Sequence, residues 1–291
     1  LAINLDTSIY GTFAEIGAGQ ETVRHFFRAG GASQTIAKAM SAYDKDFSDA
    51  IYGKEVKNRY VTQNRLRKML RYEMALIEER IPREKNPGKK FFSYANTVTT
   101  INFDKTSKGH GWVGIRYQNN ENEDFNEIVI HVKFKETNAT LQQETLGSLG
   151  VNLIYGAYFY ADNPRILIES LYDDISLDRL EIDMIDFSGP GFQYVDNRLM
   201  SLQLVKLGMT DAVIFNSEGN NMLPADILYK KNIFAVRGSF RPVTKVNIDI
   251  FEQGLEMFNK DNACDSYNTQ ILFEITISNL RADGDINERD F

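Results

Sequence analysis

The sequence predicts an α/β fold: a helical N-terminal region over residues 1–88, a small antiparallel portion, and then a mostly parallel sheet with flanking helices. Two observations lead to this prediction. Before residue 88 the apolar residues recur mainly at helical spacing, whereas after residue 142 strand-length apolar runs alternate with helical patterns, which is typical of βαβ units. We therefore expect a region 1–88 and a sheet region 89–291, divided near the charged turn at 82–90.

Three helices are expected in the N-terminal region. Residues 20–28 place their apolar side chains on one side, and a glycine pair follows them. Ser33 could then cap a second helix that runs through Met40. Residues 64–81 carry leucine, isoleucine and methionine along one face and charged residues along the other, which is the pattern of an amphipathic helix.

The apolar period changes to that of strands after residue 90. Strands are expected over 91–103, 112–118 and 127–135. In the last of these, Ile128, Ile130 and Val132 alternate with positions that include His131 and Lys133, so an antiparallel sheet with one exposed face is expected. On this pattern His131 is more typical of a surface histidine than of a metal ligand.

The rest of the chain alternates between the two patterns and predicts crossover units of a parallel sheet. Helices are expected over 145–160, 163–175, 197–207 and 248–258, and strands over 180–187, 212–215, 233–236 and 270–277.

Composition excludes several classes of function. The chain has 291 residues, with 33 Lys and Arg against 40 Asp and Glu, and this acidic balance argues against a general nucleic-acid binder. A single cysteine, Cys264, excludes an intramolecular disulfide and a zinc site built on several thiolates.

With no signal-peptide pattern and no apolar run long enough to cross a bilayer, the chain is expected in the cytoplasm, away from membranes. Residues 285–291 have the pattern of a helix start without its body, so we expect a longer protein cut at this end.

Several strings of the sequence resemble a bacterial family of uncharacterised proteins. They are YGTFAEIGAGQE at 10–21, SAYD at 41–44, GHGW at 109–112, VDNRLMS at 195–201, LYKK at 228–231 and RGSFRPVT at 237–244. The resemblance covers the whole chain, and family members usually continue past its end. Their labels, TonB-dependent receptor and nicotinate-nucleotide adenylyltransferase, conflict, and the resemblance implies no site residues.

Neither label is supported by motifs in this chain. A receptor barrel needs an export signal and many alternating strands. Adenylyltransferases of the nicotinate type use two histidines in a His-x-Gly-His motif, whereas His25, His110 and His131 lie far apart in this sequence. A dinucleotide fingerprint is also incomplete at Gly17 and Gly19, because its third glycine is missing.

One candidate binding loop follows the strand expected over 180–187. Asp183 and Asp186 lie on that strand, and Ser188, Gly189 and Gly191 follow it. Ligands of open α/β sheets bind beyond the carboxyl ends of strands. Glycines there let backbone amides approach an anion, and the aspartates would suit Mg²⁺ or a hydroxyl group. The alternative is a tight turn beside solvated acids.

A second candidate loop holds Arg237, Ser239 and Arg241 after the strand expected over 233–236. Two guanidinium groups around a glycine would suit a phosphate or carboxylate. The alternative is a surface loop whose cations pair with nearby acids. If both loops face one cleft, acids and cations together make a phosphoester site.

These observations favour an enzyme, or part of one, that handles a phosphorylated or nucleotide-like small molecule. We expect a small-molecule ligand, and the sequence leaves a homo-oligomer open. The alternatives are a non-catalytic assembly or interaction protein, for which the aromatic segment 155–160 could supply the interface, and the adenylyltransferase of the family label.

Overall fold

The computed structural model describes residues 1–260, 268–280 and 284 of the chain, which its contacts divide into two compact units, Leu1–Ala212 and Val213–Phe291. The first unit is built on a six-stranded mixed sheet in the order β2-β1-β3-β4-β5-β6. Its strands are β1 (Ile9–Ile16), β2 (Ile36–Met40), β3 (Lys90–Thr99), β4 (His110–Tyr117), β5 (Asn126–Phe134) and β6 (Leu180–Ser188).

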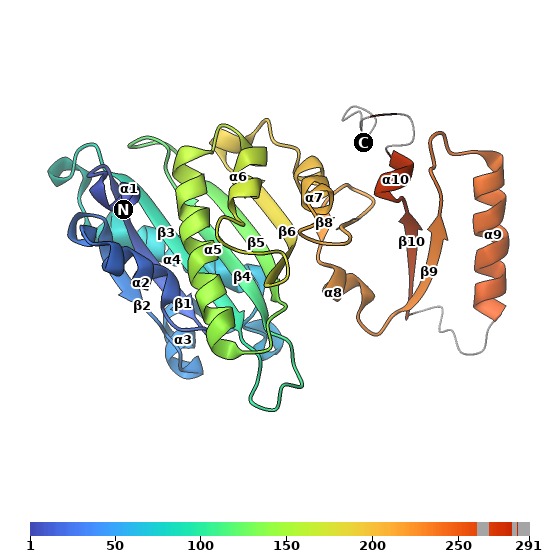
Figure 1. The fold of residues 1–291 in the computed structure, drawn as a ribbon, viewed down its shortest axis with the longest axis horizontal. Helices are drawn as coiled ribbons and strands as arrows, with labels where there is room; N and C mark the ends of the chain where they lie inside the picture. Colours follow the sequence, from blue (N-terminus) through green and yellow to red (C-terminus); the bar gives the residue numbers. More distant parts are fainter. Residues whose placement is uncertain (261–267, 281–283, 285–291) are drawn as a thin grey trace. The chain divides into compact units, whose positions relative to one another are not determined.

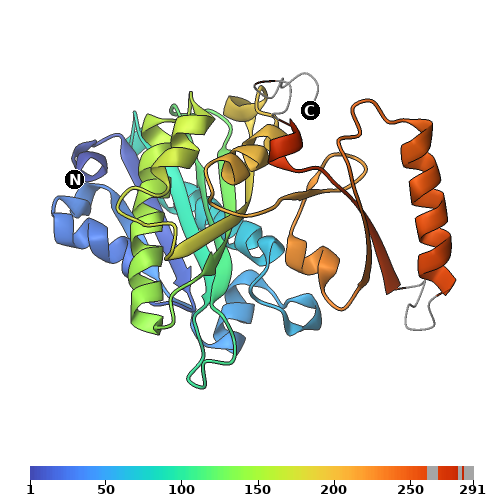
Figure 2. The same cartoon turned by 45° about the vertical axis from the view of Figure 1, so that its right-hand side comes forward.

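Helices flank both faces of this sheet (Figure 1). The helices of the first unit are α1 (Ala2–Leu5), α2 (Glu21–Ala29), α3 (Lys45–Tyr52), α4 (Gln63–Arg80), α5 (Ala139–Phe159), α6 (Pro164–Ser170) and α7 (Asn197–Lys206). Helices α2 and α5 pack together on one face, and α4 contacts β1, β3 and β4 from the opposite face, as the turned view in Figure 2 also shows.

The α/β class with flanking helices is confirmed, but the sequence predicts the wrong place for the parallel pairing. In the first unit β1 pairs in parallel with β2 and with β3, whereas β3, β4, β5 and β6 pair antiparallel in chain order. Among the described residues, the parallel pair that occurs late in the chain lies within the second unit, between β9 and β10.

The prediction of a helical region over 1–88 is wrong, because two strands of the central sheet come from it. Residues 36–40, expected in a helix, form β2 beside β1; backbone pairing with a neighbouring strand here overrides the helical spacing of the side chains. The charged turn at 82–90 joins α4 to β3 inside the first unit, since β3 pairs with β1 along its length.

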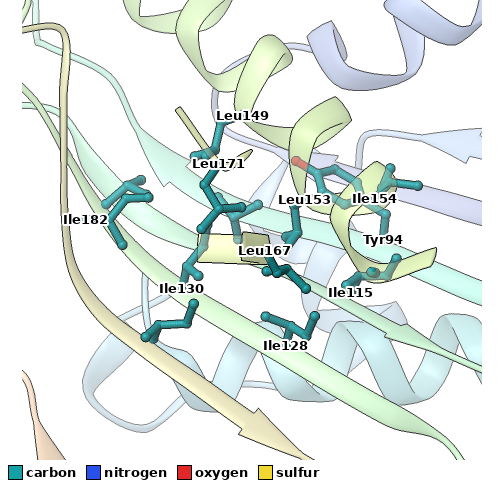
Figure 3. Packing of buried hydrophobic residues seen from close by; sticks show 14 of the residues in the cluster. Tyr94, Ile115, Ile128, Ile130, Leu149, Leu153, Ile154, Leu167, Leu171 and Ile182 are labelled. Carbon is teal, nitrogen blue, oxygen red and sulfur yellow. The ribbon is translucent and has the colours of Figure 1, made fainter. Parts of the chain in front are cut away.

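The main core lies between α5 and the sheet. Figure 3 shows Leu149, Leu153 and Ile154 of α5 facing the strand residues Ile115 and Ile130, and all five side chains are fully buried. Alternation along the strands sends these residues to one face and leaves the intervening positions for the face on the α4 side.

A buried carboxylate on β1 fixes the start of α2. The Glu15 side chain accepts hydrogen bonds from the backbone N–H groups of Thr22 (3.1 Å) and Val23 (2.9 Å) and from the amide of Asn96 (3.1 Å) on β3. Burial raises the pKa of Glu15, although these donors act in the opposite direction. In a dinucleotide-binding site, a phosphate would lie at the helix N-terminus next to the glycine turn. Here the Glu15 carboxylate occupies that position at the start of α2.

The second unit contains β9 (Asn232–Arg237) and β10 (Thr269–Glu274), with α9 (Lys245–Lys260) between them in sequence. Its other elements are the pair β7 (Ile214–Phe215) and β8 (Asn221–Met222), together with α8 (Pro224–Leu228) and α10 (Ile277–Leu280). Rings of α9 contact rings of both long strands, as in Phe251 with Phe234 and Phe273. The expected crossover at 233–277 is therefore confirmed. Cys264 and the helix start expected at 285–291 lie outside the described residues.

Replacing Glu15 with alanine should lower the free energy of unfolding by about 2–3 kcal/mol, because two backbone N–H groups and the Asn96 amide would lose a charged acceptor inside the protein. Denaturant unfolding followed by circular dichroism measures the change. Glu21→Ala is the matched control, since Glu21 begins the same helix and contacts the exposed Arg24; it should cost less than about 1 kcal/mol. Equal losses in the two variants would contradict the role of Glu15.

Candidate functional site

Two histidines and an aspartate form a hydrogen-bonded chain on three adjacent strands. His131 Nδ1 lies 2.6 Å from Asp183 Oδ1, and His131 Nε2 lies 3.4 Å from His110 Nδ1. His131 and Asp183 are each 2% exposed, whereas His110 is half-buried. The chain therefore runs from a buried carboxylate, through a buried imidazole, to an imidazole that solvent can reach.

Strand register brings these residues together. In the β4–β5 pair His110 lies opposite Lys133, and Trp112 lies opposite His131. The β5–β6 pairing shifts between His131 and Val132, and an irregularity of this kind re-aims the neighbouring side chains. Trp112 packs against His131 with ring centroids 4.8 Å apart, which holds the imidazole in place.

The hydrogen bonds fix the tautomer of both rings. A carboxylate can only accept, so His131 donates its Nδ1–H to Asp183, and a neutral His131 must then accept at Nε2. His110 consequently donates its Nδ1–H to His131. The Nε2 atom of a neutral His110 therefore carries a free lone pair, which is the arrangement that a general base requires.

Lys133 extends the chain with a positive charge. Its ammonium lies 2.7 Å from Asp183 Oδ2 and 3.2 Å from Glu181. Burial alone would raise the pKa of Asp183, but the interaction with His131 and the hydrogen bond and charge of Lys133 outweigh burial and lower the pKa. Asp183 therefore stays ionised, as an acceptor for His131 and Lys133 rather than an open metal ligand.

The pKa of His110 is lowered from its ordinary value of 6.5. Burial is the largest cause, the neighbouring His131 and the positive charge of Lys133 add to it, and the Asp183 carboxylate opposes them. His110 is thus neutral near pH 7, in the protonation state of a base.

Asp186 belongs to a separate ion-pair network on the same side of the sheet. Arg67 of α4 pairs with Asp186 at 2.5 Å and also with the buried Glu127, which Arg116 contacts at 3.2 Å. Asn197 donates to the second oxygen of Asp186. Burial raises the pKa of Asp186, and the Arg67 charge acts against that rise. This network joins α4 to β4, β5 and β6.

The loop at 188–191 is closed against the start of β5. The backbone N–H of Gly191 donates to the Asn126 side chain at 2.7 Å. Gly189 has a φ of +111°, and a Cβ atom there would lie 2.6 Å from the carbonyl oxygen of Phe125. A glycine is required here by close packing of the loop onto β5, and Ser188 ends β6 in register with Glu127.

The second predicted loop lies in the second unit. Arg237 pairs with Glu274 at 2.8 Å across the β9–β10 register, and both side chains are largely exposed. Ser239 and Arg241 are exposed in the segment that follows β9. The sequence-predicted residues thus divide between the two units, and their convergence on one cleft stays a prediction.

Sequence reasoning missed the histidine chain. It considered proximity along the chain, and by that measure His110 and His131 are unrelated. The available signal was the alternation of β5, which places His131 and Lys133 on one face, combined with an antiparallel partner strand that carries His110 and Trp112. The expectation of His131 as a surface histidine is wrong, because the ring is 2% exposed.

Within residues 1–260, 268–280 and 284, no group of three or more His, Cys, Asp or Glu side chains is arranged to hold a metal ion. In the same described ranges, no helix combines the length and apolar character that crossing a bilayer requires.

Replacing Lys133 with methionine should raise the pKa of His110, because the ammonium disfavours the imidazolium. Asp183→Asn should lower that pKa further below 6.5, because the carboxylate favours the imidazolium. NMR titration of the imidazole nitrogens measures both values. The ring signals of His25, which lies on α2, should not differ between the variants and serve as the control. Shifts of the same sign in both variants would contradict the electrostatic account.

Comparisons with known proteins add no relative. No protein-family model matches the chain, and no curated protein or solved structure is significantly similar to it.

Proposed function

We propose that the protein is a cytoplasmic enzyme in which His110 acts as a general base on a phosphorylated or nucleotide-like small molecule. The observation that carries the proposal is the Asp183–His131–His110 chain, in which a buried carboxylate and a fixed imidazole lie behind a half-buried imidazole. A base oriented by a further group is the recurring arrangement in catalytic sites that activate a hydroxyl or a water.

In the proposed step, His110 Nε2 takes the proton of a water or of a substrate hydroxyl. The oxygen that loses this proton forms a bond to the electrophilic centre of the substrate. The Nδ1 proton of His110 can then pass to His131 Nε2, whose Nδ1–H already faces Asp183. The carboxylate stabilises the resulting imidazolium without taking up the proton. The bond between the electrophilic centre and the leaving group then breaks, and the leaving group takes the proton back through His110, so that both imidazoles are neutral again.

We propose phosphate recognition separately for the loop after β9 in the second unit. Arg237 pairs with Glu274 in an exposed geometry, and pairs of this kind contribute only about 0–1 kcal/mol in water. A guanidinium held so weakly can exchange its carboxylate partner for a phosphate at small cost.

A second candidate function is assembly or interaction with another protein. Tyr155 and Phe159 of α5 stack with centroids 4.4 Å apart, although they are 36% and 47% exposed. A stacked aromatic pair in contact with solvent is typical of a binding surface. Such a surface could bind a second copy of this chain as well as a different protein.

Catalysis can be tested with sugar phosphates, phosphodiesters and nucleoside triphosphates in the presence of Mg²⁺, with release of phosphate or pyrophosphate as the measurement. His110→Gln should reduce the rate about 10²–10⁴-fold, because a positioned base contributes that much. His25→Gln is the matched control, since His25 is an exposed histidine of α2, and it should leave the rate unchanged.

Full activity in His110→Gln would refute the role of this base. A chain that turns over none of these compounds, but forms a large species in light scattering that Phe159→Asp abolishes, would favour the interaction protein.

A further inference from the structure

A cavity lies between α4 and the two parallel strands at the β2 edge of the sheet. Its volume is about 240 Å³. Most of its wall is apolar, from Tyr10 of β1, Leu76 and Ile77 of α4, and the following Ile81. The polar lining consists of Thr12, Lys38, Glu73 and Arg80. None of these residues belongs to the histidine chain or to the loops discussed above.

Glu73 is the buried polar group of this cavity, with no measurable exposure. Its Oε1 accepts from the Tyr52 hydroxyl at 2.7 Å, and its Oε2 accepts from the Thr12 hydroxyl at 3.2 Å and lies 2.5 Å from Lys38 Nζ. Burial and the Glu73 charge raise the pKa of Tyr52 far above its ordinary value, so Tyr52 remains a donor. The carboxylate therefore has a donor from each of three other elements, α3, β1 and β2.

Glu73 fixes Lys38 at the edge of the cavity. The Lys38 side chain is 34% exposed, and an ammonium has three N–H donors, of which the contact with Glu73 uses one. The other two donors have a fixed orientation, because moving the ammonium away from Glu73 would leave the buried Glu73 carboxylate without its counter-charge. An oriented donor costs less entropy to bind than a freely rotating lysine.

The charge at the cavity is positive. Lys38 neutralises Glu73, and the guanidinium of Arg80 adds a positive charge at the wall. Arg80 contacts Glu79 at 3.5 Å, but both side chains are about 70% exposed, and such pairs are weak in water. A ligand anion can therefore draw Arg80 toward itself.

We propose that this cavity binds a small organic monocarboxylate, with its apolar body against Tyr10, Leu76 and Ile77 and its carboxylate between Lys38 and Arg80. The apolar wall favours a short aliphatic or aromatic body. A planar carboxylate matches the fork of a guanidinium and accepts from an ammonium at the same time. Inorganic phosphate fits poorly, because it would place a doubly charged, fully polar ion against apolar side chains.

Benzoate and 4-methylpentanoate are suitable probes, with benzamide and 4-methylpentanamide as neutral molecules of the same shape. Titration of the full chain at millimolar concentrations, followed by amide NMR shifts, should move the signals of residues 37–38 and 76–81 with the acids. The amides should bind at least about tenfold more weakly, which corresponds to the loss of one charge-assisted hydrogen bond.

Variants separate the cavity from adventitious binding. Arg80→Gln should weaken benzoate about tenfold, while Arg71→Gln, an exposed position on the same helix, should leave its affinity unchanged. Ala37→Phe places a ring at the cavity from an exposed strand position and should abolish the shifts without unfolding the protein. The melting temperature of each variant, measured in parallel, shows that a loss of binding is not a loss of fold.

Any of four results would overturn the proposal. These are equal affinity for benzoate and benzamide, NMR shifts at other residues, unchanged binding in Ala37→Phe, and no binding of either acid. The outcome is independent of the His110 experiment, because the two sites share no residue.

Discussion

A carboxylate can be buried only where protein donors replace the water that it loses, and this requirement organises the first unit. Glu15 accepts hydrogen bonds from residues of α2 and β3, and Glu73 contacts donors on β1, β2 and α3. Glu127 pairs with arginines of α4 and β4. Asp183 does the same with two residues of β5. Since removal of either partner would leave an uncompensated charge, each carboxylate ties together elements that are distant in sequence.

Both proposed sites depend on a buried carboxylate of this kind. In each, a fully buried acid immobilises a more exposed basic group: Asp183 fixes His131 and through it His110, and Glu73 fixes Lys38. In neither proposal does the acid itself react or bind the charged group of the ligand. Its contribution is to orient a donor or acceptor before a ligand arrives, which lowers the entropy cost of binding or reaction.

The sequence predicts most elements but not how they pair. Periodicity finds the long helices α2, α4 and α5 and the strands β3 to β6, because their apolar faces meet one large core. It fails at β2, a short edge strand whose pairing with β1 decides its conformation. The histidine chain escapes prediction because it depends on the β4–β5 register and on a shift between β5 and β6. The position of Asp183 near the end of a predicted strand indicates a candidate site residue, but it does not indicate which residues Asp183 contacts.

The mixed pairing of the sheet has a consequence for biosynthesis. Strands β3 to β6 pair with their successors in the chain, so most of these contacts can form soon after the residues leave the ribosome. β1 pairs with the nearby β2 along one edge, but its other edge pairs with β3: Ile9 lies opposite Lys90, and Phe13 opposite Tyr94. That edge of the earliest strand must therefore remain unpaired, and accessible to chaperones or to aggregation, until β3 has been made.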